Sequence, residues 1–270
     1  MNIFNVLITS AGRRVSLVRL FQKALIKLNL NGIVYAVDLQ DHAPALLAAD
    51  KFQTVPKVSD LNYIEKLLEI CLENQIKLVV PTIDTELLIL SKQRKRFLSH
   101  GIQILTCSNN VNQIFFDKRS TQLFFSKNKI PAPHLYILEE AKQLGSAYFP
   151  LLLKPNNGSC SIGVTKVHSQ KELLFFLDYL KDPIVQEFIE GDEYTIDVLL
   201  DFNGKIKCVV PRLRLETRAG EVSKSITVRD LKIIDWACKI CSSIEGALGC
   251  ITIQCIKQKN GEKISWADLM

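Results

Sequence analysis

The sequence has 270 residues, of which 47% are hydrophobic and 23% charged, a composition that excludes a disordered, collagen-like or coiled-coil chain. The net charge of +6 is modest for this length, so we expect no nucleic-acid partner, whereas a small phosphate-bearing ligand would suit the charge. The length favours two compact units or one large α/β unit, because a typical domain has about 100–200 residues.

Residues 1–110 alternate between buried strands and amphipathic helices. A strand over residues 6–9 leads through a turn of small residues into a helix that begins at residue 15. Strand 33–38 follows this helix and completes a βαβ unit. Another strand–helix–strand run ends at residue 81, and Thr82, Asp84 and Glu86 follow where a parallel sheet usually binds its ligand. This pattern predicts an N-terminal domain with a doubly wound parallel sheet over residues 1–110.

Residues 111–270 form a second domain with a different pattern. A helical segment over residues 112–127 precedes an extended, proline-fixed linker at residues 130–133. Strands and hairpins follow, including a strong turn signal at Asn203-Gly204. The sequence therefore predicts an α+β domain after the parallel sheet.

The loop over residues 156–163 is the first candidate site. Its Gly, Ser and Asn residues would let backbone N–H groups approach phosphate oxygens, and Lys154 before it would supply a mobile charge. A surface hairpin with glycine at its tip has the same pattern, and the loop is not a P-loop because no Gly-Lys-Ser/Thr follows.

Four segments in order resemble the ATP-grasp superfamily, with the nearest likeness to the large subunit of carbamoyl-phosphate synthase. The segments are residues 116–121, 130–133, 149–163 and 185–194. The N-terminal part resembles the Rossmann-like domain that precedes ATP-grasp domains. The resemblance thus implies an α/β protein with a pre-ATP-grasp domain and, over residues 111–270, a two-lobed ATP-grasp domain lacking its C-terminal end.

The resemblance implies ATP and Mg²⁺ as cofactors. Lys118 and Lys154 would contact the phosphates, residues 187–189 would form the hinge that binds adenine, and Glu193 would accept the ribose hydroxyls. The implied nucleotide-binding residues are Lys118, Lys154, Asn157, Gly158, Ser159, Ser161, Gly163, Glu187, Phe188, Ile189 and Glu193.

Three arginines follow this segment. Arg212 and Arg214 would project from one face of a strand, where guanidinium groups can hold a carboxylate or an acyl phosphate, although a solvated basic face is an equal alternative. The resemblance places the acceptor substrate nearby and makes Arg218 the candidate catalytic residue.

The metal end of the domain departs from the family pattern. Gln254 and Asp268 are the implied Mg²⁺ ligands, but Met270 falls where the family has Asn. Mg²⁺ prefers hard oxygen ligands, and a thioether is a poor one. We therefore expect either a protein whose chemistry is lost or weakened, or a site completed by another subunit.

The function implied by the resemblance is that of a carboxylate–amine ligase acting through an acyl phosphate, with ATP and an unknown carboxylate as substrates. A non-catalytic nucleotide-binding remnant or partner-dependent subunit is the alternative, and a homo-oligomer is compatible with either. An NAD(P)-dependent Rossmann oxidoreductase is disfavoured, because the first turn has one glycine, Gly12, followed by Arg13 and Arg14.

Eight scattered cysteines, mostly in apolar segments, indicate free buried thiols in a reducing, cytoplasmic protein. Cys238 and Cys241 lie in an apolar helical stripe, which favours core packing over zinc binding. No apolar run reaches the length of about 18–20 residues that spans a bilayer, so we expect no membrane partner.

Overall fold

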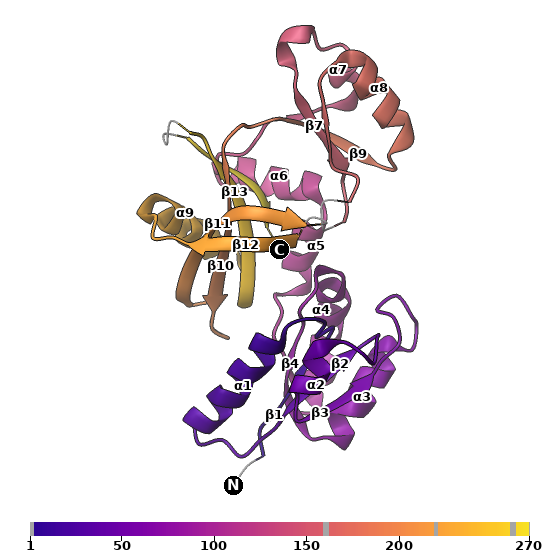
Figure 1. Cartoon of the computed structure of the whole chain (residues 1–270), viewed down its shortest axis with the longest axis vertical. Helices are drawn as coiled ribbons and strands as arrows, with labels where there is room; N and C mark the ends of the chain where they lie inside the picture. The colour runs from indigo at the N-terminus through magenta and orange to yellow at the C-terminus, as the bar shows by residue number, and fades with distance from the viewer. Residues whose placement is uncertain (1–2, 159–161, 219–220, 260–262, 270) are drawn as a thin grey trace. The chain divides into compact units, whose positions relative to one another are not determined.

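The computed structural model describes residues 3–158, 162–218, 221–259 and 263–269. The chain divides into two compact units, Met1–Asn109 and Asn110–Met270 (Figure 1). Within the described ranges, no helix is both long and apolar enough to cross a membrane.

The first unit is a five-stranded parallel sheet in the order β3-β2-β1-β4-β5, which confirms the predicted doubly wound fold. Its elements are β1 (Asn5–Ile8), α1 (Val15–Lys27), β2 (Val34–Asp38), α2 (Pro44–Ala48), β3 (Lys51–Thr54), α3 (Tyr63–Glu73), β4 (Ile76–Val80), α4 (Asp84–Ser99) and β5 (Gln103–Ile104). Helices α1 and α2 pack on one face, where Val6 and Ile8 point, and α3 and α4 pack on the other, where Leu7 points. Burial on both faces explains why the strands are apolar throughout.

A buried carboxylate joins the segments that follow β1 and β4, two neighbouring strands of this sheet. Glu86, in the first turn of α4, is 0% exposed and accepts hydrogen bonds from Thr9 Oγ1 (2.7 Å), Tyr63 Oη (2.6 Å) and Ser10 Oγ. Thr9 and Ser10 follow β1, and Ser10 has a positive φ of 45°. The three hydroxyl donors satisfy the carboxylate where the strand order reverses, and so fix the turn after β1.

We expect the free energy of unfolding to fall as the pH rises above 10, partly because of Tyr63. Burial, and then the Glu86 carboxylate, raise the pKa of Tyr63 above its ordinary value of 10.0. At higher pH the unfolded state therefore loses this proton before the folded state does, which favours unfolding. Urea unfolding between pH 8 and 11 should show a smaller pH dependence for Tyr63→Phe than for wild type; equal slopes would contradict the assignment.

The second unit begins with helices and a four-stranded antiparallel sheet in the order β6-β9-β7-β8. Its elements are α5 (Asn109–Phe116), α6 (Lys118–Lys127), β6 (Leu135–Tyr136), α7 (Leu138–Ala141), a 3₁₀ turn (Ser146–Tyr148), β7 (Leu151–Pro155), β8 (Thr165–Val167), α8 (Gln170–Tyr179) and β9 (Pro183–Glu187). Helices α7 and α8 pack beside β7 and β9, and Leu151, Leu153 and Leu173 form the core between them (Figure 1). We call this part the small lobe.

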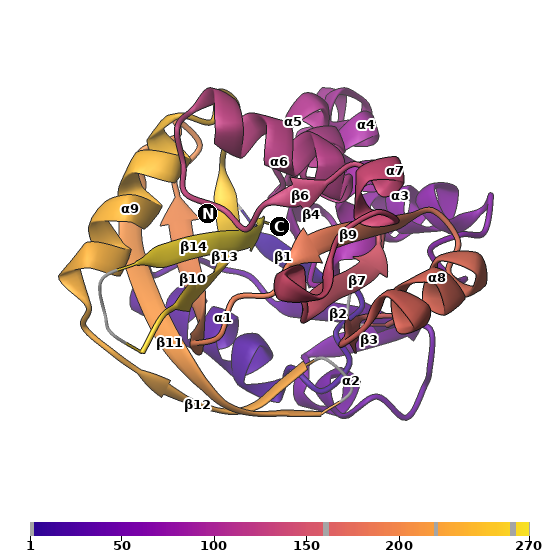
Figure 2. The same ribbon diagram turned by 90° about the horizontal axis from the view of Figure 1, so that it is seen from above.

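The rest of the unit is a five-stranded antiparallel sheet in the order β12-β11-β10-β13-β14 (Figure 2). It comprises β10 (Asp192–Leu200), β11 (Ile206–Arg218), β12 (Glu221–Thr227), α9 (Leu231–Ser242), β13 (Gly249–Lys257) and β14 (Ile264–Leu269). Helix α9 contacts β10 and β11. Its buried residues include Cys241, and all cysteines in the described ranges are free.

The helical segment predicted over residues 112–127 consists of two helices. Asp117 lies between them in an extended conformation, and its Oδ1 accepts the backbone N–H of Ser120 at 2.7 Å, which caps α6. An N-cap carboxylate satisfies one of the free N–H groups at a helix start. The cap places Lys118 at the first position of α6.

Candidate functional site

Lys154 lies on the face of the small-lobe sheet opposite its helices. Leu151 and Leu153 point into the core under α7 and α8, and strand alternation places Lys154 on the other face. Its side chain is well enclosed, since the residue is only 5% exposed. The sheet therefore carries a lysine on the face that its helices leave uncovered, directly before the glycine-containing loop.

The loop after β7 requires glycine at its far end. Gly163 has a φ of +76°, and an added Cβ would lie 2.9 Å from Pro155 Cγ. Gly158 also has a positive φ, of 120°, and both Asn157 and Gly158 are exposed. The predicted residues Ser159 and Ser161 lie outside the described residues.

The structure brings Lys118 to this loop. Its Nζ donates hydrogen bonds to the carbonyl oxygens of Asn156 (3.2 Å) and Gly158 (3.0 Å), and its backbone N–H donates to Asn156 O at 3.2 Å. The predicted lysine and the predicted loop, about 40 residues apart in the sequence, are therefore neighbours in space.

The predicted hinge begins at Glu187, the last residue of β9. Glu187 pairs with His134 through both its backbone N–H, which donates to His134 O at 2.8 Å, and its Oε2, which accepts the His134 N–H at 3.2 Å. The Phe188 ring lies 3.8 Å from Lys166 Nζ, and Ile189 is buried. Hydrogen bonds thus fix the start of the hinge to the residue before β6, and a cation–π contact links Phe188 to β8.

Glu193 lies on β10 among polar residues of the five-stranded sheet. Arg214 of β11 forms an ion pair with Glu193 Oε2 at 3.2 Å, and its Nη1 donates to Gln254 Oε1 at 3.4 Å. Arg212 Nε donates to Asp197 Oδ2 at 2.7 Å. Both arginines therefore contact carboxylates of the chain itself.

The predicted metal ligands lie on adjacent strands. Gln254 of β13 is the register partner of Asp268 of β14. An amide oxygen and a carboxylate are hard donors of the type that Mg²⁺ takes, and a nucleotide would supply phosphate oxygens, so this donor set fits the ion. The side chains of Asp268 and Arg218 lie outside the described residues, and those that are described contain no cluster of three His, Cys, Asp or Glu suited to a metal.

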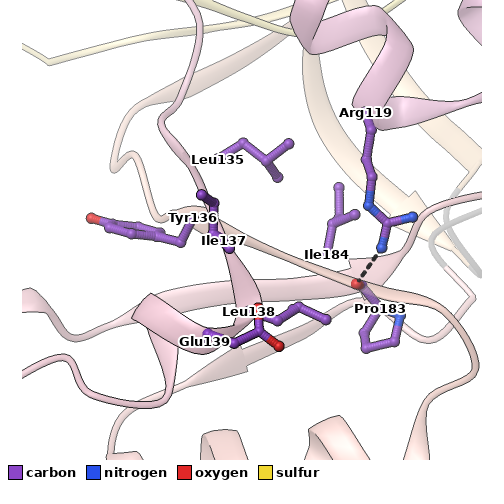
Figure 3. A pocket seen from close by; sticks show the side chains of 8 residues that line it. All are labelled: Arg119, Leu135, Tyr136, Ile137, Leu138, Glu139, Pro183 and Ile184. Carbon is purple, nitrogen blue, oxygen red and sulfur yellow. Dashed lines mark hydrogen bonds between the residues drawn. The ribbon is translucent and has the colours of Figure 1, made fainter.

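A pocket of about 290 Å³ lies elsewhere on the small lobe (Figure 3). Arg119 closes one side of it, donating from Nη2 to Pro183 O at 3.0 Å. The other lining residues are Leu135, Tyr136, Ile137, Leu138, Glu139, Pro183 and Ile184. Among the residues that the structure describes, no predicted nucleotide-binding residue lines this pocket.

The sequence analysis places Asn156 at the start of the candidate loop but does not predict that its side chain joins the loop to its surroundings. Asn156, only 3% exposed, contacts Asp117 and Asp182 through its side chain. Aspartate is a preferred N-cap residue, which makes Asp117 a recognisable helix start, but nothing local indicates that Asn156 reaches two segments distant in the sequence.

The order of these parts defines a class of protein: a doubly wound sheet, a small antiparallel lobe with lysines around a glycine-containing loop, and a larger antiparallel sheet. Residues 115–264 match the family described as "ATP-grasp domain", and residues 6–105 match "PylC-like, N-terminal domain". The match to the ATP-grasp domain covers more than half of the chain, so the chain belongs to the ATP-grasp family.

Similar proteins include a D-alanine–D-alanine ligase B of Chromobacterium violaceum, 33% identical over 110 residues (37% of this chain and 35% of that protein). A carbamoyl-phosphate synthase of Methanobrevibacter smithii is 23% identical over 154 residues, 55% of this chain and 42% of that protein.

Among solved structures, the biotin carboxylase domain of the Hydrogenobacter thermophilus 2-oxoglutarate carboxylase, crystallised with MgADP, ADP and bicarbonate, superposes with a TM-score of 0.75 at 16% identity. The superposition covers 100% of this chain and 64% of that one. The chain thus spans less than two thirds of the length of these relatives.

Proposed function

We propose that the chain binds ATP with Mg²⁺, and that the protein is a carboxylate–amine ligase of the carbamoyl-phosphate-synthase-like type. The observation that carries the proposal is the position of Lys118, whose ammonium contacts the loop that begins two residues after the enclosed Lys154. Two cations beside a loop of small residues suit a polyphosphate.

In this proposal Lys118, Lys154 and the loop hold the phosphates, with Asn157, Gly158 and Gly163 letting the backbone approach. Residues 187–189 bind the adenine edge, and Glu193 accepts the ribose hydroxyls. Gln254 and Asp268 would hold Mg²⁺, which neutralises phosphate charge when bound.

The reaction would proceed in two displacements. A carboxylate oxygen of the substrate attacks the γ-phosphorus of ATP, so that an acyl phosphate forms and ADP leaves. The amine nitrogen then attacks the acyl carbon, inorganic phosphate leaves, and the nitrogen loses a proton. Arg218, on the same strand as Arg212 and Arg214, is assigned to the acyl phosphate, while the lysines hold the reacting groups in place and offset their charge.

One observation favours a second candidate, a nucleotide-binding protein without turnover or one completed by a partner subunit or a second copy. Glu193 and Gln254, assigned to ribose and metal, both contact the Arg214 guanidinium. A cation beside Gln254 opposes a second cation there. ATP binding without catalysis would follow if this arrangement persists.

Thermal unfolding with and without MgATP tests both candidates. A ligand that binds only the folded state adds about 2.7 kcal/mol at 100 times its dissociation constant, so we expect a clear rise in Tm. Phosphate release is then measured with panels of carboxylates and amines. A Tm rise with substrate-dependent release supports the ligase, and a rise without release supports the second candidate. No rise at millimolar MgATP would contradict nucleotide binding by the chain alone and leave only the partner-completed form of the second candidate.

A further inference from the structure

The side chain of Asn156 connects three segments of the small lobe. Its Oδ1 accepts the backbone N–H of Arg119 at 3.2 Å, while its Nδ2 donates to Asp117 Oδ2 at 2.6 Å and to Asp182 Oδ2 at 3.2 Å. An amide has two N–H donors and one oxygen, so the described partners use all three groups. We call Asn156, Asp117, Asp182 and Arg119 the Asn156 cluster.

The backbone of Asn156 is held in the same place. Its N–H donates to Asp182 O at 2.9 Å, and its carbonyl oxygen accepts from both the backbone N–H and Nζ of Lys118. Arg119 also donates from Nη1 to Asp182 Oδ1 at 2.8 Å. The first residue of the loop is thereby fixed to the start of α6 and to the turn between α8 and β9.

The charges of the cluster explain why an amide stands at this position. Hydrogen bonding by Arg119 lowers the pKa of Asp182. Burial raises the pKa of Asp117, but the hydrogen bonds that Asp117 accepts from Ser120 and Asn156 outweigh burial, so the pKa of Asp117 is lowered overall. Two ionised carboxylates therefore converge on Nδ2. A neutral double donor satisfies both, whereas a third carboxylate would be repelled.

This arrangement positions one of the acceptors that Lys118 contacts. Its ammonium donates to the carbonyl oxygens of Asn156 and Gly158, and the first of these is fixed by the cluster. Charged phosphate oxygens are stronger acceptors than neutral carbonyls, so a bound polyphosphate can replace the two carbonyl oxygens as the acceptor of the Lys118 ammonium. Without a ligand, the carbonyl oxygens hold the ammonium beside the loop.

We propose that Asn156 is a positioning residue of the nucleotide site: by tying the first residue of the loop to Asp117 and Asp182, it holds the Lys118 ammonium where the phosphates bind. The inference rests on the proposed nucleotide binding. It adds a residue that acts through Lys118 without touching the nucleotide.

The test compares Asn156→Ala and Asn156→Asp with wild type by calorimetric titration of MgATP and of adenosine, which lacks phosphates. We expect MgATP to bind at least about tenfold more weakly to both variants, while the affinity for adenosine changes less than about twofold. Equal losses for the two ligands would show a merely structural role. Asn128→Ala is the matched control, because Asn128 donates to Phe124 O at the other end of α6 and contacts no loop residue described here.

Hydrogen exchange gives a second measurement that needs no nucleotide. The Arg119 amide should exchange faster in Asn156→Ala, which lacks its acceptor, and remain as in wild type in Asn128→Ala. Unchanged exchange in Asn156→Ala would overturn the proposal. If wild type binds no MgATP, the proposed function fails; if wild type binds it and Asn156→Ala binds it equally well, only the positioning role fails.

Discussion

Gly191→Ala is expected to lower the free energy of unfolding by about 3 kcal/mol or more, the upper range for overpacking a close contact. Gly191 lies between β9 and β10, where an added Cβ would stand 2.4 Å from Lys257 O and 2.8 Å from Lys257 C. These are backbone atoms at the end of β13, so no side-chain rotation relieves the contact. Strand β10 and the end of β13 must separate, and Glu193 moves with β10.

Urea unfolding of the full chain measures this effect. Gly145→Ala is the matched control, because an added Cβ at Gly145 would have no neighbouring atom within 4 Å and its φ is not positive. Alanine there is expected to leave stability unchanged or to raise it by about 0.4–1 kcal/mol through the unfolded state. Similar losses in the two variants would contradict the contact with Lys257.

Lys154→Met is expected to abolish most of the stabilisation by MgATP while leaving the unliganded protein folded. Methionine replaces the aliphatic part of the side chain and removes the charge, and residue 154 is 5% exposed. Removing a cation that is largely shielded from solvent should weaken the binding of MgATP by about 100-fold, or roughly 2.7 kcal/mol.

The measurement for Lys154→Met is the dissociation constant for MgATP beside the Tm without ligand. Lys171→Met provides the control, since Lys171 is an exposed lysine of α8 on the same lobe. Wild-type affinity for MgATP in Lys154→Met would place the phosphates away from this lysine. Equal weakening in both variants would point to general electrostatics.

Much of the fold could be predicted because its signals are local. Apolar strands alternating with amphipathic helices specify the parallel sheet, and the Asn203-Gly204 turn lies between β10 and β11 as expected. The break at Asp117 was not predicted, although six consecutive polar residues begin there. The extended conformation of Asp117 and its side-chain cap divide the segment into two helices.

Parts of the candidate site could be predicted where the order of segments in the sequence carries information. The order of segments was enough to select Lys118 and the loop, which the structure joins. The partners of Asn156 are 26 and 39 residues away, and the contact of Arg214 with Glu193 and Gln254 depends on the register of three strands. Such contacts arise from tertiary packing, which no local pattern encodes.

The contact between Lys166 and Phe188 adds to a link between β8 and the hinge that the sheet already provides. Val167 of β8 and Glu187 of β9 both pair with Leu151 of β7, so the backbone hydrogen bonds of the sheet hold the two segments together. Lys166 is exposed, and a cation–π contact at an exposed site contributes about 0.5–1 kcal/mol. This contact therefore favours the position of the Phe188 ring over β8 by a factor of about five at most, while the sheet sets the distance between β8 and the hinge.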